Sequence, residues 1–163
     1  MALNELLGFK GNIVCTDKNK FLIIGSICSA LAALVHLGCI IFGGHWYRFF
    51  GAGEQMARMA ENGHWYPTVV TLVIVLILSV WSLYALSGAR VIFKMPFLRL
   101  GLVLISAIYL IRSLAFVSIM PMFPENSLTF WLVSSGITFT IGLLYAIGTF
   151  QVWSHFSSES AQL

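Results

Sequence analysis

The chain is 163 residues long, with 59% hydrophobic residues, only 9% charged residues and a formal net charge of +3 at pH 7. Because soluble domains carry about 25% charged residues, this composition excludes a water-soluble single domain, a disordered protein and a nucleic-acid-binding module. All but one of the charged residues lie outside four long apolar stretches. The sequence therefore predicts an integral membrane protein.

Each of the four apolar stretches is long enough for the roughly 20 residues that a membrane-crossing helix needs. None alternates polar and apolar residues as barrel strands do, so we expect helices. Ser127 is expected to be the N-cap of the fourth helix. The fold expected is an all-α membrane protein, a bundle of four transmembrane helices with a short interfacial helix between the first two. The expected transmembrane domain covers residues 21–158, with spans at about 21–43, 67–89, 100–120 and 127–153 and cytoplasmic tails at 1–20 and 159–163.

Basic residues are unevenly divided between the two ends of the predicted helices, and this division predicts the orientation. Six would lie on the side of both termini, and two on the other side. Because Lys and Arg are enriched in cytoplasmic loops, we expect both termini to be cytoplasmic. The sequence contains no Asn-x-Ser/Thr sequon, which fits a bacterial inner membrane. The six are Lys10, Lys18, Lys20, Arg90, Lys94 and Arg99, and the two are Arg48 and Arg58.

The first loop, residues 44–66, is longer than a plain connection needs. Glu54, Arg58 and Glu61 fall near one face at helical spacing, and apolar residues fall near the other. This pattern predicts a short helix lying in the membrane surface, with an intrahelical pair between Glu54 and Arg58. Aromatic residues flank the helix and are expected to anchor it at the interface or to form the rim of a pocket. They are Trp46, Tyr47, Trp65 and Tyr66.

Several segments of the chain carry a resemblance to a known group of proteins. They are WYRFFGAGEQMARMAE, WYPTVVT, LYALSGA and PFLRL, and the match covers roughly residues 44–112. In these segments the chain resembles a group of small, uncharacterised bacterial four-helix membrane proteins. The resemblance implies a location in the bacterial inner membrane and no particular activity.

Arg112 is the only charged residue inside a predicted span. An arginine at the bilayer centre costs on the order of 3 kcal/mol, and such residues usually face the bundle interior or a water-filled cavity. His36, Ser134 and Ser135 are expected at a similar depth, in the outer half of the membrane. One interpretation is that Arg112 extends to the interface and hydrogen-bonds to Ser134 or to backbone carbonyls.

The other interpretation is an outward-facing pocket between the first, third and fourth helices. Arg112 and His36 would hold an anionic or carbonyl-bearing ligand there, because arginine suits bidentate contact with carboxylate or phosphate. The loop helix, with Glu54, Arg58 and Glu61, would cap the pocket. The counter-charge for Arg112 would come from an acidic residue of the outer loops, from a lipid phosphate or from the ligand.

Two similarities between the halves of the sequence predict that the chain consists of two related hairpins. Aligning Gly25 with Gly101 also places His36 on Arg112. The two helices involved run in the same direction, so this is a parallel repeat that would place His36 and Arg112 near a pseudo-two-fold axis. The second similarity is the triplet Leu-Tyr-Ala, which occurs at residues 83–85 and again at 144–146.

The sequence lacks the P-loop, GxGxxG, HExxH and GxSxG motifs, so we expect no catalytic residue, no metal site and no cofactor. The first hypothesis is a bacterial inner-membrane accessory or structural protein without catalysis, which supports a membrane-protein partner or self-associates as a homo-oligomer. The second is a binding protein for a membrane lipid or a small anionic ligand. A membrane-embedded enzyme is the third. A nucleic-acid partner is not expected.

Overall fold

The structure is a computed structural model that describes residues 18–160, with side chains as far as residue 153. Residues 1–17 and 161–163, which include most of the predicted tails and Lys10, lie outside the described residues. Every regular element in the described part is helical. In chain order the elements are α1 (Lys20–Phe42), α2 (Gly44–Phe49), α3 (Glu54–Glu61), α4 (Trp65–Gly88), α5 (Leu98–Leu114), α6 (Phe116–Ile119), the 3-10 turn η1 (Met120–Met122) and α7 (Leu128–Ser160).

Three helices are long and apolar enough to cross a membrane: α1, α4 and the part of α7 from Leu128–Trp153. A fourth crossing exists only if α5 and the segment Phe116–Met122 count as one span, because they are bent by 54°. The third predicted span is therefore interrupted. Near the break, the Ser113 hydroxyl donates to the Leu110 carbonyl at 2.7 Å. Such back-bonding to the preceding turn often bends helices.

Polar side chains cap the N-termini of two of the long helices, α1 and α7. The side chain of Asn19 accepts a hydrogen bond from the Leu22 amide at 3.0 Å, and that of Ser127 accepts one from the Phe130 amide at 3.1 Å. Both satisfy backbone donors that a helix start leaves unpaired. Ser127 was expected as this cap, whereas the part played by Asn19 is found only in the structure.

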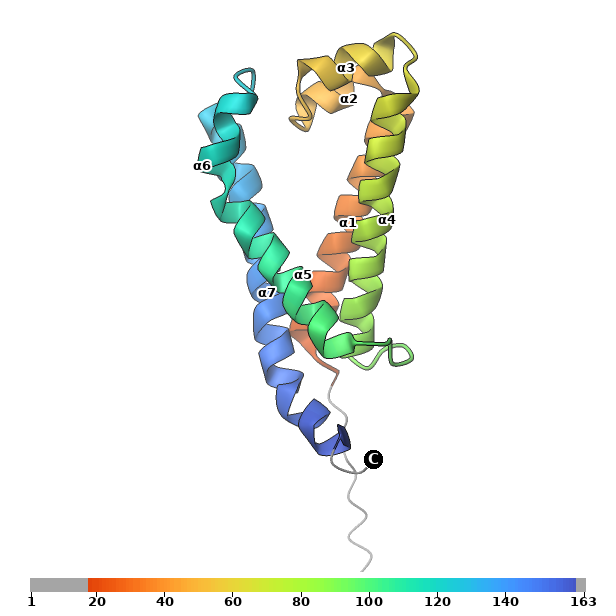
Figure 1. The fold of residues 1–163 in the computed structure, drawn as a ribbon, viewed down its shortest axis with the longest axis vertical. Coiled ribbons are helices and arrows are strands. Elements are labelled where there is room, and N and C mark those ends of the chain that lie inside the picture. The colour runs from red at the N-terminus through yellow and green to blue at the C-terminus, as the bar shows by residue number, and fades with distance from the viewer. Residues whose placement is uncertain (1–17, 161–163) are drawn as a thin grey trace, which may run out of the picture.

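The long helices form two pairs, as Figure 1 shows. α1 lies beside α4, and α5 lies beside α7. The pairs meet near the beginning of α1 and α5 and diverge toward the opposite end, where α2 and α3 lie. We call the end that carries α2 and α3 the upper end and the opposite end the lower end.

Two contacts between glycine and tyrosine join the pairs in a reciprocal way. A methyl group at Gly25 of α1 would lie 3.0 Å from the ring of Tyr145 of α7. A methyl group at Gly101 of α5 would lie 2.5 Å from the ring of Tyr84 of α4. Each ring therefore rests on a backbone that a larger residue would push away. These are the residues that the sequence repeat aligns, and a two-fold axis between the hairpins would produce this reciprocity.

A chain of buried hydroxyl groups also links the pairs. The Ser29 Oγ lies 2.9 Å from the Tyr109 hydroxyl and 2.8 Å from the Tyr145 hydroxyl. The Tyr145 hydroxyl donates to the Trp81 carbonyl at 3.1 Å. Because each hydroxyl has one proton and a carbonyl only accepts, Ser29 must donate to Tyr145 and Tyr109 must donate to Ser29. One directed chain thus connects α5, α1, α7 and α4.

Within the first pair, two serines allow α1 and α4 to approach closely. The Ser82 hydroxyl donates to the Ser26 carbonyl at 3.0 Å, and the two Oγ atoms lie 2.8 Å apart. Since Ser82 has already used its proton, Ser26 donates to Ser82. Small residues with hydrogen-bonding side chains are typical of helix contacts in membranes.

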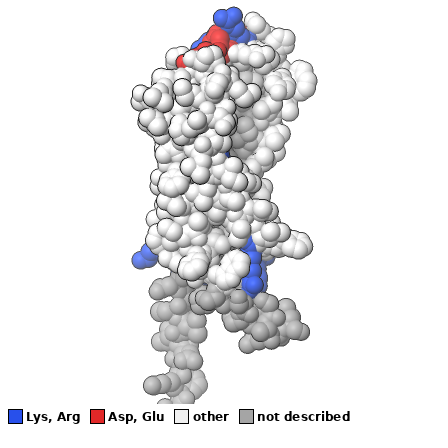
Figure 2. All heavy atoms as spheres, turned by 60° about the vertical axis from the view of Figure 1, so that its left-hand side comes forward, with Lys and Arg blue, Asp and Glu red and all other residues white. Residues whose placement is uncertain are grey.

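The charged residues gather at the two ends of the molecule. Figure 2 shows basic and acidic residues together at the upper end, basic residues at the lower end and a largely uncharged surface between them. Many large apolar side chains of the long helices are exposed, including Leu34, Leu76 and Ile137. An uncharged apolar band of this kind is typical of a surface that faces lipid.

We expect Tyr145→Phe to destabilise the protein, because the substitution leaves the Ser29 proton without its acceptor. Hydrogen bonds between membrane helices contribute roughly 0.6–1.7 kcal/mol. The midpoint of thermal unfolding in detergent should therefore fall by about 2–6 °C. Tyr66→Phe is the matched control, because Tyr66 is exposed. Equal midpoints for the two variants would contradict the role given to the hydroxyl chain.

Candidate functional site

Above the contact between Tyr84 and Gly101, helices α4 and α5 separate. Ile77 and Ile108 stand seven residues further toward the upper end on the same faces of their helices. In a parallel packing these side chains would cover each other. Instead they are 43% and 47% exposed. The two helices have therefore diverged within two turns of their contact.

Arg112 stands on this diverging face of α5, eleven residues above Gly101. The corresponding residue of α4 is Val73, which stands eleven residues above Tyr84 and is 48% exposed. Arg112 is also exposed. It therefore faces the space between the two helix pairs, which we call the wedge.

The guanidinium of Arg112 lies against an aromatic ring of α7. Its Cζ atom is 5.8 Å from the centre of the Trp131 ring, a distance typical of a cation–π contact. Leu110 packs on Gly142, which is three turns below Trp131. The arginine side chain must therefore extend upward to reach the indole. Among residues 18–153, Arg112 has no hydrogen bond and no ion pair, so the predicted bond to Ser134 is not present.

Two buried polar atoms of α7 lie unpaired beside this contact. The Trp131 Nε1 and the Ser135 Oγ have no hydrogen-bond partner among the described residues. Their residues are only 2% and 7% exposed. They lie one turn apart on one face of the helix. Leaving a buried donor unpaired costs about 1–3 kcal/mol, so such groups call for a specific explanation.

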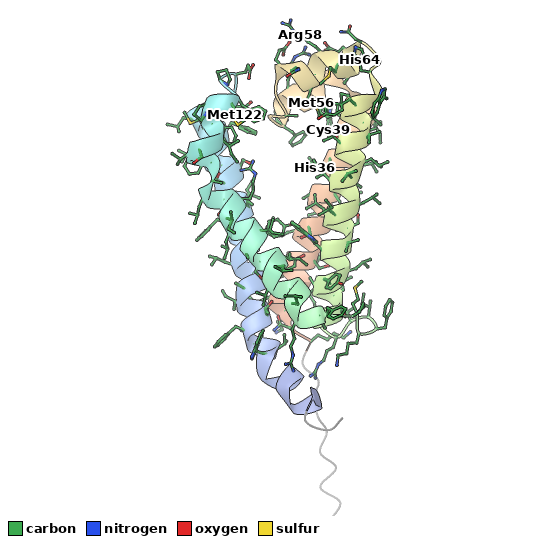
Figure 3. All side chains as sticks on the ribbon, in the orientation of Figure 1. His36, Cys39, Met56, Arg58, His64 and Met122 are labelled. Carbon is green, nitrogen blue, oxygen red and sulfur yellow. The ribbon has the colours of Figure 1, made fainter. Side chains whose placement is uncertain are left out.

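On the other side of the wedge, α1 faces α7 in the register set by Gly25 and Tyr145. His36 and Ser134 each stand eleven residues above that contact, and both are half-buried. The His36 Nδ1 lies 2.7 Å from the Ala32 carbonyl, which only accepts, so Nδ1 carries the proton. In the neutral ring, Nε2 is then an acceptor. Figure 3 places His36 on the side of α1 that faces the other helix pair.

The upper end of the wedge is closed by the turn between α2 and α3, residues 50–53, which we call the cap. The Asn126 side chain donates to the Gly51 carbonyl at 3.0 Å. The Phe130 ring packs directly on Gly51, where a side chain would collide with it. Gly51 also has a φ of 72°, in the left-handed region that favours glycine. The cap thus joins the α1–α4 pair to the beginning of α7.

The cap reaches the arginine site through two aromatic rings. The Phe123 ring would lie 3.1 Å from a methyl group at Gly53. The rings of Phe123 and Phe130 lie 6.2 and 5.9 Å from that of Trp131, between centres. Trp131 in turn contacts Arg112. The cap therefore covers the ring on which the guanidinium rests.

The loop acids pair with Arg48 and Arg58 and leave Arg112 without an acidic partner among the described residues. Arg48 of α2 donates through Nε to Glu54 at 2.7 Å and through Nη2 to Glu61 at 3.0 Å, which ties α2 to α3. The predicted pair within α3 is present, with Arg58 donating to Glu54 at 2.8 Å. Glu54, Arg58 and Glu61 thus form a network with Arg48 at the upper end.

This network shifts the pKa values of three of its members, Glu54, Glu61 and Arg48. The hydrogen bond from Arg48, followed by that from Arg58, lowers the pKa of Glu54 from 4.5 to about 2. The hydrogen bond from Arg48 also lowers the pKa of Glu61. The same bonds, first to Glu61 and then to Glu54, raise the pKa of Arg48. Glu54, Glu61 and Arg48 therefore stay charged at neutral pH.

The four aromatic residues predicted at the interface have different surroundings. Trp65 and Tyr66 are exposed at the start of α4. Trp46 is half-buried and packs against α1. Tyr47 is buried, and its hydroxyl donates to the Pro67 carbonyl at 3.2 Å. The structure thus makes Tyr47 a link between α2 and α4, where a surface anchor was predicted.

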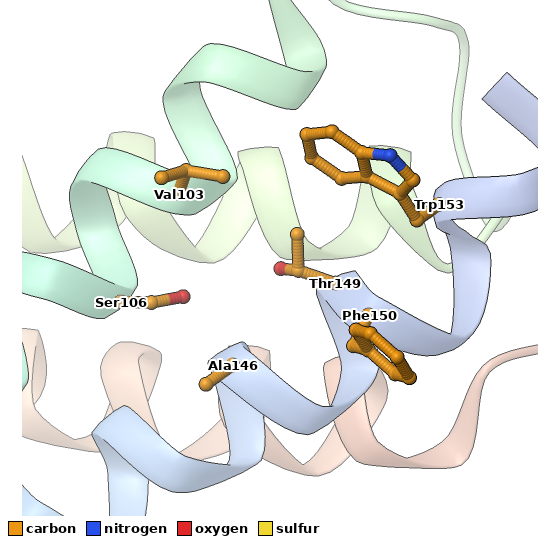
Figure 4. Close-up of a pocket in the computed structure, with 6 residues that line it drawn as sticks. All are labelled: Val103, Ser106, Ala146, Thr149, Phe150 and Trp153. Carbon is orange, nitrogen blue, oxygen red and sulfur yellow. The ribbon is translucent and has the colours of Figure 1, made fainter. Parts of the chain in front are cut away.

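A separate groove lies lower on the molecule, between α5 and α7 (Figure 4). Its two hydroxyl groups are already paired within their own helices: Ser106 donates to the Leu102 carbonyl and Thr149 to the Tyr145 carbonyl, each at 2.7 Å. No unpaired polar atom marks this groove. Its lining consists of Val103, Ser106, Ala146, Thr149, Phe150 and Trp153.

The structure therefore brings four of the predicted site residues to the wedge and leaves three outside it. Sequence reasoning missed Trp131 and Arg48. Trp131 lies one helical turn before Ser135, and this spacing was a usable signal. Arg48 gave no such signal, because α2 and α3 meet only after the chain turns between them. The four at the wedge are Arg112, His36, Ser134 and Ser135, and the three outside are Glu54, Arg58 and Glu61.

Comparison of the chain with protein-family models, with curated proteins and with solved structures gave no match.

We expect Arg48→Gln to raise the pKa of Glu54 toward 4.5 by more than Arg58→Gln does, because the bond from Arg48 has the larger effect. Since folding lowers this pKa, the stabilisation is complete above about pH 4.5 and is lost as the pH falls toward 2. Carboxyl carbon NMR of the full-length protein in micelles measures the shift. A larger rise in Arg58→Gln would show that Arg48 is not the centre of the network.

Proposed function

We propose that this protein is a multi-pass, four-helix protein of the bacterial inner membrane that binds an anionic ligand in the wedge, without catalysis. The observation that carries the proposal is the set of unpaired groups around Arg112. The Arg112 guanidinium is exposed without an acceptor, and beside it the Trp131 Nε1 and the Ser135 Oγ are buried without a hydrogen-bond partner among the described residues. A ligand rich in acceptor oxygens supplies what this set lacks.

The chemistry of the three groups favours an anion over a neutral ligand. Arginine remains charged under all conditions and can hold a carboxylate or phosphate through two hydrogen bonds. The indole N–H only donates, and a serine hydroxyl can donate as well. Charge-assisted bonds of this kind are roughly twice as strong as neutral ones. Carboxylate and phosphate groups fit this set of donors.

A purely structural accessory role explains less. Such a role predicts polar residues that are satisfied within the bundle, as Ser26 and Ser82 are. It leaves the unpaired atoms of Trp131 and Ser135 without an explanation. Glu54 and Glu61, two of the acids that could have neutralised Arg112, are instead paired with Arg48. We therefore place ligand binding ahead of the accessory role.

The proposed orientation puts the upper end in the periplasm and both termini in the cytoplasm. Lys94 and Arg90 near the lower end then obey the preference of basic residues for the cytoplasm. Alkaline phosphatase, which is active only in the periplasm, should be active when fused after Gly63 and inactive when fused after Lys94 or Leu163. The opposite pattern of activity would reverse the proposed orientation.

We expect Arg112→Ala to lose the ligand that co-purifies with the protein, with a fall in occupancy of at least about tenfold. The reason is that this change removes the only cation at the wedge in the described part of the chain. Native mass spectrometry of protein released from mild detergent measures the occupancy. Arg58→Ala is the matched control, because Arg58 is exposed and pairs with Glu54. The proposal is wrong when both variants retain the same species as the unmodified protein.

A further inference from the structure

The wedge has two sides of different chemistry, and this difference bears on the class of ligand. Between α1 and α7, the facing residues His36 and Ser134 are polar and half-buried. Between α4 and α5, the facing residues Ile77 and Ile108 are apolar and nearly half exposed. One side is thus polar and half-buried, and the other is apolar and open. Val73, higher on α4, extends the apolar side toward Arg112.

The apolar side has a floor. The Tyr84 ring rests on Gly101, and the rings of Trp81 and Tyr109 lie 4.9 Å apart between centres. Arg112 stands eleven residues above Gly101, which is about 16 Å at the helical rise of 1.5 Å per residue. Between this floor and the arginine, the α4–α5 side presents apolar side chains over several turns.

The wedge is covered from above and open from the side. The cap contacts Phe130 and Phe123, whose rings flank Trp131. Asn126 fastens the cap through its bond to Gly51. In a bilayer the upper end faces water, whereas the exposed isoleucines of α4 and α5 face acyl chains. A ligand that reaches Arg112 past Ile77 and Ile108 therefore comes from the lipid phase.

We propose that the ligand is an anionic lipid, whose headgroup lies against Arg112 beneath the cap and whose acyl chain lies between α4 and α5. This inference rests on the proposed function and adds the source of the anion and its route. The acyl chain covers Ile77 and Ile108, which the helices leave uncovered. The charge of the headgroup neutralises Arg112, which no acid among the described residues does.

The test compares two tryptophan variants of α5. Ile108→Trp fills the apolar side of the wedge, whereas Leu114→Trp adds the same bulk on a face about 120° further around the helix, where Leu114 is 68% exposed. Native mass spectrometry of the full-length protein measures binding of added phosphatidylglycerol, with phosphatidylcholine and inorganic phosphate as the other probes. We expect binding of phosphatidylglycerol to fall about tenfold in Ile108→Trp only. Phosphatidylcholine should bind more weakly to the unmodified protein, and phosphate should not displace the anionic lipid.

A second pair of variants on α4 tests the same inference, so the test does not depend on whether both α5 variants fold. Val73→Trp fills the wedge opposite Arg112, and Leu72→Trp adds the same bulk at a neighbouring exposed position that points elsewhere. Variants whose unfolding midpoints match that of the unmodified protein are compared. Weaker lipid binding in Val73→Trp than in Leu72→Trp supports the same acyl-chain position.

The outcomes separate this inference from the proposed function. Displacement of the lipid by phosphate, with no difference between Ile108→Trp and Leu114→Trp, means that the anion is soluble. The acyl-chain inference then fails and the anion site stands. When neither phosphatidylglycerol nor phosphate binding depends on Arg112, both proposals fail. Loss of lipid in Ile108→Trp, together with loss of the preference for phosphatidylglycerol in Arg112→Gln, supports both.

Discussion

The arrangement of this protein depends on one set of contacts in its lower half, where two tyrosine rings rest on glycines and a hydroxyl chain runs through Ser29. Within a lipid bilayer, helices gain little from burying apolar surface against each other, because the surrounding lipid is equally apolar. Close backbone approach and hydrogen bonds must hold the two pairs together. Because these contacts are confined to the lower half, the upper halves are free to diverge.

The divergence explains why the candidate site exists. Arg112, Val73 and Ile108 occupy faces that would be covered in a parallel bundle, and the separation of the helices leaves them exposed. At the upper end, the cap restores contact through Gly51 and Asn126. The result is a region held from below and covered from above. The pairing of the loop acids with Arg48 and Arg58 then leaves the arginine of the wedge as an unpaired cation among the described residues.

The contacts of Gly25 with Tyr145 and of Gly101 with Tyr84 place the two hairpins in equivalent positions. The hairpins nevertheless carry different side chains at these equivalent positions. His36 and Arg112 occupy equivalent positions, as do Ser134 and Val73. One side of the wedge therefore carries an imidazole and a hydroxyl, whereas the other carries a guanidinium and an isopropyl group. An amphiphile suits such an asymmetric space better than a small symmetric anion does, because its two ends need different surroundings.

Sequence alone determined the approximate positions of the long apolar helices, the helix N-cap at Ser127 and the ion pair between Glu54 and Arg58, because hydropathy, capping and i,i+4 spacing are local properties. It also singled out Arg112 by its depth. Only the tertiary structure decided that Arg48 takes the loop acids, that Trp131 receives the guanidinium and that α5 breaks near Ala115. These outcomes depend on where separate helices cross and diverge, and the relative placement of two helices is set by contacts between residues far apart in the chain.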